Sequence, residues 1–241
     1  MIELEGRVAI ITGATSGIGT ALARAFDRRG MRLVLTGRRE DRLQTLAGEL
    51  GAARTLAGDI TDPGLPQRLV DEALSAFGRL DVACNNAGLL EFGTIDEIDL
   101  GRMALMVRVN VEAAFRVAYT VLRHFKAQNS GHLVNTSSIA GTKVRPTIGA
   151  YAGTKHAIEA MAQSLRLELA ETNVRISNIQ PGLTSTEIFD HLTADAHPRG
   201  QQGITEPLTP EDIARCVVFM LEQPAHVHIP AMLVKPQSQP L

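Results

Sequence analysis

Short apolar runs alternate along the chain with longer amphipathic stretches. The runs are four or five residues long and predict strands over Val8–Thr12, Arg32–Thr36, Arg54–Ala57, Leu80–Cys84, His132–Thr136, Arg175–Ile179 and Ala231–Val234. Several are apolar almost throughout, as in parallel strands that are covered on both faces. The stretches between them have helical spacing and predict helices over Ile18–Arg29, Glu40–Glu49, Pro66–Phe77, Leu100–Ala127, Tyr151–Glu171 and Pro210–Gln223. This alternation predicts an α/β fold with a parallel sheet, right-handed crossovers and helices on both faces.

Turn-forming residues support these boundaries. Gly30, Gly51 and Gly78 each follow a helical stretch, where glycine most easily takes the left-handed conformation that ends a helix. Thr209 stands before a proline and three residues before Asp212, which predicts the start of a helix. The one long stretch without a predicted element is 183–208, which is rich in polar residues, glycine and proline. An irregular segment of that length in a compact domain is usually functional or mobile.

Length and composition describe an ordinary globular protein. The 241 residues fit one domain, 1–241, better than two, and 44% hydrophobic residues suffice for a core. A formal net charge of −2 gives no general reason to expect nucleic acid or an anionic membrane as partner. No apolar run approaches the roughly 20 residues that cross a bilayer, so no membrane association is expected.

The cysteines and the N-terminal residues bear on the compartment. Residues 1–6 hold two glutamates and no basic residue before the first apolar run, unlike a secretory signal. Cys84 and Cys216 have no recognisable metal or redox spacing. We therefore expect a cytoplasmic protein with two unpaired thiols and no metal site.

A glycine-rich turn, Thr12–Gly19, follows the first predicted strand and opens into the first predicted helix. Glycines there permit a tight turn and let the backbone approach a pyrophosphate, which the helix N-terminus then attracts. The spacing is GxxxGxG rather than the GxGxxG of the commoner dinucleotide fingerprint, and a purely structural turn would use the same residues. The dinucleotide contacts expected here are Gly13, Thr15, Ser16, Gly17, Ile18 and Gly19.

The end of the second predicted strand indicates which dinucleotide binds. An acidic residue there would bind the free ribose hydroxyls of NAD and repel a 2′-phosphate. Arg38 and Arg39 stand there instead, and the planar guanidinium fork suits a phosphate. NADP(H) is therefore the predicted cofactor. The alternative is that both arginines only solvate the start of the next helix.

Two later strand ends add candidate cofactor contacts. Asp59, after the third strand, would accept a hydrogen bond from an adenine amino group, or would instead cap a helix that begins near Asp62. Asn85–Gly88, after the fourth strand, offers small residues that let the chain pass closely beneath a cofactor, although a plain turn would use them too. The contacts expected from these segments are Asp59, Ile60, Asn86, Ala87 and Gly88.

Tyr151 and Lys155 are four residues apart at the start of a predicted helix, so both project from one face. A tyrosine with the ordinary pKa of about 10 is a poor base near neutrality. A neighbouring ammonium favours the phenolate, so we expect Lys155 to lower the pKa of Tyr151 toward the working range. Taken alone, such a pair is more often a surface contact.

Two further polar residues complete a candidate catalytic set. Ser138, near the end of the fifth strand, supplies a hydroxyl that can hold a substrate oxygen, although serines there usually form turns or caps. Asn110, inside the long predicted helix, would anchor a water for proton relay or simply face solvent. Their occurrence in order with Tyr151 and Lys155, behind a phosphate loop, indicates hydride transfer between a nicotinamide and a carbonyl or alcohol.

In this combination the chain resembles the short-chain dehydrogenase/reductase family over essentially its whole length. The matching motifs are Thr12–Gly19, Asn85–Gly88, Asn110, Ser138, Tyr151 with Lys155, and Pro181-Gly182 after the sixth strand. The resemblance implies a single-domain Rossmann fold with a seven-stranded sheet. It also implies that the segment 183–208 is a substrate loop that closes over the site.

The family pattern implies a role for each catalytic candidate. Tyr151 would be the acid/base, Ser138 would polarise the substrate oxygen, and Lys155 would bind the nicotinamide ribose and tune Tyr151. Asn110 would belong to the proton relay. Ile18 would support the nicotinamide ring, and the pocket for that ring would include Pro181, Gly182, Thr184 and Thr186.

The resemblance also bears on cofactor choice and assembly. Many relatives carry a basic residue where this chain has Ser16, so a 2′-phosphate would fall mainly to Arg38, with Arg39 assisting. The C-terminal run 223–236 resembles serine and 3-hydroxy-acid dehydrogenases and clavulanic-acid-type aldehyde reductases, which use NADP(H) and are often tetramers. His228 and Pro230 depart from that subgroup's usual residues. A homotetramer or homodimer is implied by the resemblance alone.

The expected substrate is a small aldehyde, ketone or keto acid, or the corresponding alcohol. A carboxylate on it would require a cation, and the candidates are Lys143, Arg145, His191, His197 and Arg199. Such residues are also common as solvated surface groups. A 3-oxoacyl thioester reductase would use the same site. A non-catalytic dinucleotide sensor would be expected to lack the tyrosine or the lysine, and the chain is short for a sugar-nucleotide epimerase with a separate substrate domain.

Overall fold

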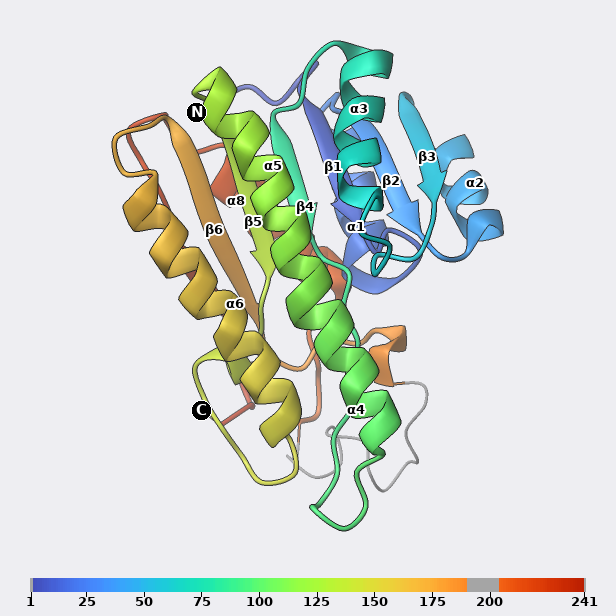
Figure 1. Ribbon diagram of the computed structural model, residues 1–241, viewed down its shortest axis with the longest axis vertical. Coiled ribbons are helices and arrows are strands. Elements are labelled where there is room, and N and C mark those ends of the chain that lie inside the picture. The colour runs from blue at the N-terminus through green and yellow to red at the C-terminus, as the bar shows by residue number, and fades with distance from the viewer. Residues whose placement is uncertain (1, 190–203, 241) are drawn as a thin grey trace.

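Seven strands form one sheet in the order β3-β2-β1-β4-β5-β6-β7, and every neighbouring pair is parallel (Figure 1). The computed structural model describes residues 2–189 and 204–240. The strands are β1 (Val8–Thr12), β2 (Arg32–Gly37), β3 (Ala53–Ala57), β4 (Val82–Asn85), β5 (Gly131–Thr136), β6 (Val174–Pro181) and β7 (Ala231–Val234). The expected seven-stranded Rossmann sheet is confirmed, and β1 and β7 have the predicted bounds.

Helices cover both faces of this sheet (Figure 1). One face carries α3 (Leu65–Phe77), α5 (Ala114–Gln128) and α6 (Gly149–Glu168), and the other carries α1 (Gly17–Asp27), α2 (Glu40–Gly48) and α8 (Pro210–Leu221). Beyond the end of the sheet, α4 (Leu100–Val107) extends the line of α5. Within the described ranges, no helix is long and apolar enough to cross a bilayer.

The strand β1 shows why its sequence is apolar at every position rather than at every second one. Ala9 and Ile11 belong to the core shared with α1 and α8, while Val8 and Ile10 belong to the core shared with α3, α5 and α6. All five residues of β1 are buried. Burial of each large aliphatic side chain contributes roughly 1.5–3 kcal/mol to the stability of the fold. Because helices cover both faces of the sheet, the residues on both faces of β1 must be apolar.

The long helix predicted over Leu100–Ala127 is interrupted. A π-helical turn, Arg108–Ala113, joins α4 to α5, and Asn110 lies buried within it. A π turn inserts one residue into the helical ladder and often marks a functional site. Apolar spacing alone does not reveal it, because the stretch stays helical on both sides.

The predicted helix ends are confirmed in three places and wrong in one. Gly30 and Gly78 have φ values of 70° and 76°, and Thr209 caps α8 in a reciprocal pair of hydrogen bonds with Asp212. Gly51 is not left-handed. Its N–H instead donates to Asp27 Oδ1 at 2.8 Å, so a side-chain acceptor on α1 stabilises that turn without a left-handed residue.

The strand order places a crevice between β1 and β4. The chain runs outward from β1 to β2 and β3 on one side and resumes at β4 on the other. Loops that follow β1 and β4 therefore diverge at the carboxyl ends of these two strands. Ligands of open α/β sheets bind at such a reversal of strand order.

Candidate active site

A cavity of about 620 Å³ lies at the carboxyl ends of the strands. Nearly all of the site residues predicted from the sequence line it. They are Gly13, Thr15, Ser16, Gly17, Ile18, Arg38, Arg39, Asp59, Ile60, Asn86, Ala87, Gly88, Ser138, Tyr151, Lys155, Pro181, Gly182, Thr184 and Thr186. Two others, Gly19 and Asn110, are buried and are not among the residues that line the cavity.

The loop between β1 and α1 forms a cradle that larger residues would fill. Gly13 and Gly17 have φ values of 67° and 51°, a conformation that favours glycine. A Cβ on Gly19 would lie 2.1 Å from the carbonyl oxygen of Gly13, so Gly19 permits the close packing of helix on loop. Ser16, at the N-cap of α1, makes no capping hydrogen bond with its side chain. The first N–H groups of α1 are thus available to an anion in the cavity, which fits the pyrophosphate of a dinucleotide.

Partly buried hydrogen bonds hold this cradle against the loop that follows β4. The hydroxyl oxygen of Thr12 accepts hydrogen bonds from the backbone N–H groups of Asn86 and Ala87, at 2.9 and 3.0 Å. The side-chain amide of Asn86 donates to the carbonyl oxygen of Thr12 at 3.0 Å and accepts from the Thr136 hydroxyl at 3.0 Å. The loops after β1, β4 and β5 therefore form one rigid floor.

The two arginines after β2 are in different situations. Arg38 is exposed at the cavity wall and has no ion-pair partner among the described residues. Arg39 donates to the carbonyl oxygen of Thr15 at 3.0 Å and to Glu187 Oε2 at 2.7 Å. Sequence alone does not distinguish the two residues, because both partners of Arg39 come from other loops.

Asp59 does not cap a helix. Its Oδ1 accepts hydrogen bonds from the N–H and the hydroxyl of Thr61, at 2.8 and 2.7 Å, and α3 begins only at Leu65. These two hydrogen bonds, and to a smaller extent the charge of Arg38, lower the pKa of the Asp59 carboxyl. The capping alternative is therefore wrong, and the ionised carboxylate remains at the cavity wall as an acceptor.

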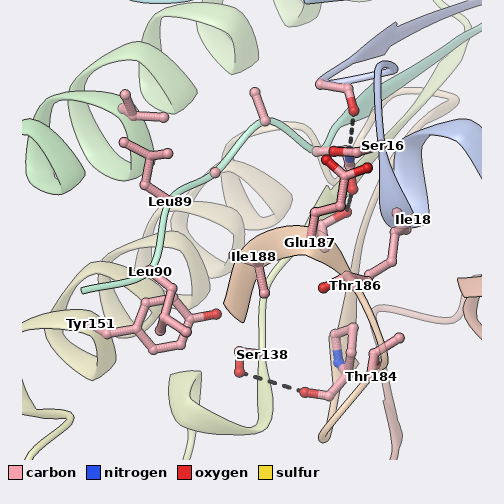
Figure 2. Close-up of a pocket in the computed structure, with 18 of the residues that line it drawn as sticks. Ser16, Ile18, Leu89, Leu90, Ser138, Tyr151, Thr184, Thr186, Glu187 and Ile188 are labelled. Atoms are coloured by element: carbon pink, nitrogen blue, oxygen red, sulfur yellow. Dashed lines mark hydrogen bonds between the residues drawn. The ribbon is translucent and has the colours of Figure 1, made fainter. Parts of the chain in front are cut away.

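The phenol of Tyr151 points into the cavity on the side of Ser138 and Ile188 (Figure 2). Ser138 has its own hydroxyl fixed, since it accepts from the N–H of Ala140 at 3.1 Å and lies 3.5 Å from the carbonyl oxygen of Pro181. Burial raises the pKa of Tyr151 to about 12, against a smaller lowering by a hydrogen bond with Ser138. At neutral pH this phenol is protonated and can donate.

Lys155 lies beside Tyr151 without lowering the pKa of the phenol. Its Nζ is 5.8 Å from the centre of the Tyr151 ring and donates to the carbonyl oxygen of Thr136 at 2.8 Å. Burial lowers the pKa of Lys155 to about 8, with Glu159 acting in the opposite direction. The expectation that the ammonium shifts the pKa of Tyr151 toward neutrality is wrong for this arrangement, because burial raises that pKa and Lys155 is not among the groups that lower it.

Asn110 holds two walls of the cavity together. Its Oδ1 accepts from the N–H of Leu89, and its Nδ2 donates to the carbonyl oxygen of Leu89, both at 2.8 Å. The same Nδ2 donates to the Thr154 hydroxyl at 3.2 Å, between Tyr151 and Lys155 on α6. Since both side-chain atoms have partners, a water bound at this residue would use the backbone carbonyl.

The far end of the cavity is apolar with a charged rim. Its apolar wall comes from Leu89, Leu90, Phe92, Leu105, Val109, Ile139, Ile148, Ile188 and Phe189. Arg145 lines this end, whereas Lys143 does not. His191, His197 and Arg199 lie outside the described residues.

Several lining residues had no signal in the sequence. Glu187, as noted, binds Arg39, and Arg102 binds Glu91 at 2.6 Å on the rim. Gln239 is buried, and its Oε1 accepts from the N–H of Leu183 at 2.9 Å, 56 residues away along the chain. Such contacts depend on tertiary structure and have no local pattern. Across the described residues, no three His, Cys, Asp or Glu side chains are grouped to hold a metal.

Comparison with known proteins agrees with this geometry. The model of the short chain dehydrogenase family matches residues 7–197. An uncharacterized oxidoreductase of Staphylococcus saprophyticus is 34% identical over 241 residues, which cover 98% of this chain and 100% of the relative.

Solved structures extend the likeness to the fold. A closed form of serine dehydrogenase complexed with NADP+ has a TM-score of 0.90 at 29% identity, over 97% of this chain and 96% of the other. A short chain dehydrogenase/reductase from Burkholderia phymatum, in complex with NAD, has a TM-score of 0.85 at 28% identity, over 97% of this chain and 90% of the other.

Proposed function

This chain belongs to the short-chain dehydrogenase family, and from that premise we propose that it is an NADP(H)-dependent oxidoreductase. It interconverts a small aldehyde, ketone or keto acid with the corresponding alcohol. The motif-based resemblance, including the likeness to serine dehydrogenase, is confirmed. Oxidoreductase chemistry with a nicotinamide dinucleotide follows from the family, while the choice of NADP(H) and of substrate is our proposal.

One observation carries this proposal. The half-buried phenol of Tyr151, on the side of Ser138, opens into the same cavity as the glycine cradle of Gly13 and Gly17 (Figure 2). Reduction of a carbonyl group requires a proton donor and a bound dinucleotide in the same cavity. Tyr151 supplies the first, and the glycine cradle offers a place for the second. A protein that only sensed a dinucleotide would have no use for the phenol.

The residues around the cavity would hold the dinucleotide at three points. The N–H groups that begin α1 bind the pyrophosphate, and Asp59 accepts from the adenine amino group. Lys155 binds the hydroxyls of the nicotinamide ribose. The bound nicotinamide supplies or accepts the hydride.

Tyr151 then moves the proton. Because its pKa is about 12, it stays protonated at neutral pH and donates to the carbonyl oxygen that Ser138 also holds. Lys155, whose pKa is about 8, gains or loses a proton easily near neutrality and is suited to restore the phenol. Asn110 supports this relay by fixing Thr154 and, through its backbone carbonyl, a water.

Arg38 supports the proposed preference for NADP(H). It stands at the end of β2 with its guanidinium exposed at the cavity and unpaired among the described residues. The position that would carry an acid in an NAD enzyme therefore carries a cation that suits a 2′-phosphate.

Arg145 supports a substrate with a carboxylate. It is the cation that the stretch between Ser138 and Tyr151 contributes to the cavity, and it stands at the apolar end, where a small substrate would lie. A carboxylate there would receive a charge-assisted hydrogen bond. This narrows the proposed substrate toward keto acids and hydroxy acids. The cytoplasmic location and the homotetramer or homodimer stay predictions.

The test is oxidation of NADPH with a panel of aldehydes, ketones and keto acids, followed by absorbance. We expect turnover with at least one member, and Tyr151→Phe lowers kcat about 1,000-fold because the proton donor is lost. The chain offers a matched control in its other tyrosine, Tyr119, which is exposed on α5. Tyr119→Phe should retain full activity.

The same assay, with 3-oxoacyl thioesters added to the panel, separates the alternatives. Tight binding of NADPH without turnover on any substrate would favour a dinucleotide sensor and refute the proposed chemistry. Much faster turnover of 3-oxoacyl thioesters than of small carbonyl compounds would favour the thioester reductase.

A further inference from the structure

Glu187 binds two arginines at the start of α2, one at its N-cap and one in its first turn. It begins the short helical turn Glu187–Phe189, after β6, and is exposed. Its Oε2 accepts a hydrogen bond from Arg39 Nη1 at 2.7 Å, and its Oε1 accepts one from Arg42 Nη1 at 2.7 Å. These partners are 148 and 145 residues away in the sequence, so the contact is purely tertiary.

The remaining donors of Arg39 point the other way, into the phosphate loop. Its Nη2 donates to the carbonyl oxygen of Thr15 at 3.0 Å, and its Nε donates to the Thr15 hydroxyl at 3.3 Å. The guanidinium is therefore held between the phosphate loop and a carboxylate. Figure 2 shows Glu187 beside Ser16, on the same wall of the cavity.

Glu187 carries its negative charge at neutral pH. Hydrogen bonds from Arg39 and then Arg42 lower the pKa of this carboxyl, so it is ionised throughout the neutral range. A carboxylate and a phosphate both prefer the planar fork of a guanidinium, and one fork face cannot serve both at once.

The contact also joins the first turn after β6 to the cofactor cradle. The side chain of Thr186, next to Glu187, lies close to Gly17. A Cβ added to Gly17 would lie 3.0 Å from Thr186 Cγ2. Thr186 and Glu187 thus close the same side of the cradle, one by packing and the other by charge.

We propose that Glu187 is a specificity-determining residue that competes with the 2′-phosphate of the cofactor for Arg39. This inference rests on the proposed NADP(H)-dependent function. Arg38, which has no ion-pair partner in the part of the chain that the structure describes, offers its guanidinium to the phosphate, while Arg39 becomes available only when Glu187 releases it. The contact between Glu187 and Arg39 weakens phosphate binding by a certain factor. By thermodynamic linkage, bound phosphate weakens the contact between Glu187 and Arg39 by the same factor.

Binding of cofactor fragments tests this without catalysis. Adenosine 2′,5′-bisphosphate carries the 2′-phosphate, and 5′-AMP lacks it, so calorimetric titration of both isolates the phosphate. We expect Glu187→Gln to bind the bisphosphate about fivefold more tightly, which corresponds to roughly 1 kcal/mol. Affinity for 5′-AMP should change less than twofold.

A second surface ion pair provides the matched control. Glu49 binds Arg24 Nη2 at 2.8 Å with a side chain 44% exposed, against 43% for Glu187, and neither Glu49 nor Arg24 lines the cavity. Glu49→Gln removes the same charge from a similar pair. It should leave both affinities unchanged.

The Arg39→Gln background separates competition from a general charge effect. If Glu187 acts by holding Arg39, Glu187→Gln loses its effect in the Arg39→Gln protein. Persistence of the full fivefold gain there would overturn the proposal, as would equal effects of Glu187→Gln and Glu49→Gln or weaker bisphosphate binding by Glu187→Gln. Thermal unfolding of each variant confirms that it is folded.

The wild-type protein tests the proposed cofactor preference separately. If it binds the bisphosphate no more tightly than 5′-AMP, the preference for NADP(H) is wrong. A gain by Glu187→Gln in that case would still support competition at Arg39.

Discussion

The two ends of the cavity are built from different parts of the chain. At the cofactor end, the wall is mainly backbone, in loops that directly follow β1 and β4 and are joined by partly buried hydrogen bonds of Thr12 and Asn86. At the substrate end, the wall is mainly side chains, which range from the buried Leu90, Val109 and Ile139 to the exposed Arg145. Few residues can be substituted at the cofactor end, whereas more side chains can be exchanged at the substrate end.

At the substrate end, a backbone hydrogen bond joins two loop segments. The segments 89–98 and 142–148 face each other there, and the N–H of Gly93 donates to the carbonyl oxygen of Thr147 at 2.9 Å between them. Val144 is 71% exposed, and Arg145 is exposed as well. Side chains so placed can change without disturbing either core.

The two ends bind different kinds of molecule: the cofactor end binds a dinucleotide, which is constant, and the substrate end binds substrates, which vary. A dinucleotide has one shape, and backbone atoms at strand ends can bind it in only a few ways. Substrates differ, and exposed side chains on loops can be exchanged to suit them at little cost in stability. Substitutions at the two ends should therefore fail in different ways.

The largest expected effect is at the cofactor end. In Gly19→Ala the new Cβ would lie 2.1 Å from the Gly13 carbonyl oxygen, a backbone atom that cannot move away cheaply. We expect the free energy of unfolding to fall by about 3 kcal/mol, and dinucleotide binding to weaken with it. Gly48→Ala is the control, because nothing lies within 4 Å of its Cβ position in α2. It should be neutral or stabilising by up to about 1 kcal/mol, and equal losses in both variants would refute the close-packing argument.

The next effect separates the two dinucleotides. Arg38→Gln should raise the KM for NADPH about 30-fold, since it removes a charged hydrogen bond worth roughly 2 kcal/mol. The KM for NADH in the same variant should change less than threefold, which makes NADH the internal control. A parallel rise for both cofactors would mean that Arg38 shapes the loop rather than binds the phosphate.

A smaller effect is expected at the substrate end. Arg145→Gln should lower kcat/KM for a keto acid about tenfold and leave a neutral ketone unaffected, because only the acid has a carboxylate to pair. Lys143→Gln, two residues away but not in the cavity wall, should have no effect on either. Both variants should unfold at the wild-type temperature. If the arginine variant turns over the keto acid as well as the wild type does, the anionic substrate is wrong.

The smallest effect is at Lys155, where the two ends meet. Its pKa of about 8 lies below the ordinary value of 10.5, so its charged form destabilises the folded protein at neutral pH. Stability gained from deprotonation therefore appears as the pH rises from about 8 to 10.5. Lys155→Met should raise the free energy of unfolding at pH 7 by about 1 kcal/mol, since loss of the hydrogen bond to Thr136 offsets part of the gain.

Urea denaturation without added cofactor, at pH 7 and at pH 9.5, measures this difference. The advantage of Lys155→Met should shrink at the higher pH, because the wild-type lysine is then mostly neutral. A constant difference at both values would show that packing rather than charge decides it.

Local pattern was sufficient wherever neighbours along the chain determine the outcome. The bounds of β1, the cap at Thr209 and the left-handed Gly30 and Gly78 were all predicted, because each depends on residues within a few positions. Gly51 failed for the opposite reason, since its partner Asp27 lies 24 residues away. The π turn at Asn110 also escaped the pattern, because its partner Leu89 comes from another loop.

By itself, the sequence determined the fold class, the glycine cradle and the Tyr151–Lys155 pair, because periodicity and short spacing are properties of a single segment. Tertiary structure alone decided that Glu187 holds Arg39, while Arg38 has no ion-pair partner within residues 2–189 and 204–240, and that Arg145 rather than Lys143 reaches the cavity. It also decided the protonation state of Tyr151, since the pKa of a phenol depends on how deeply other segments bury it.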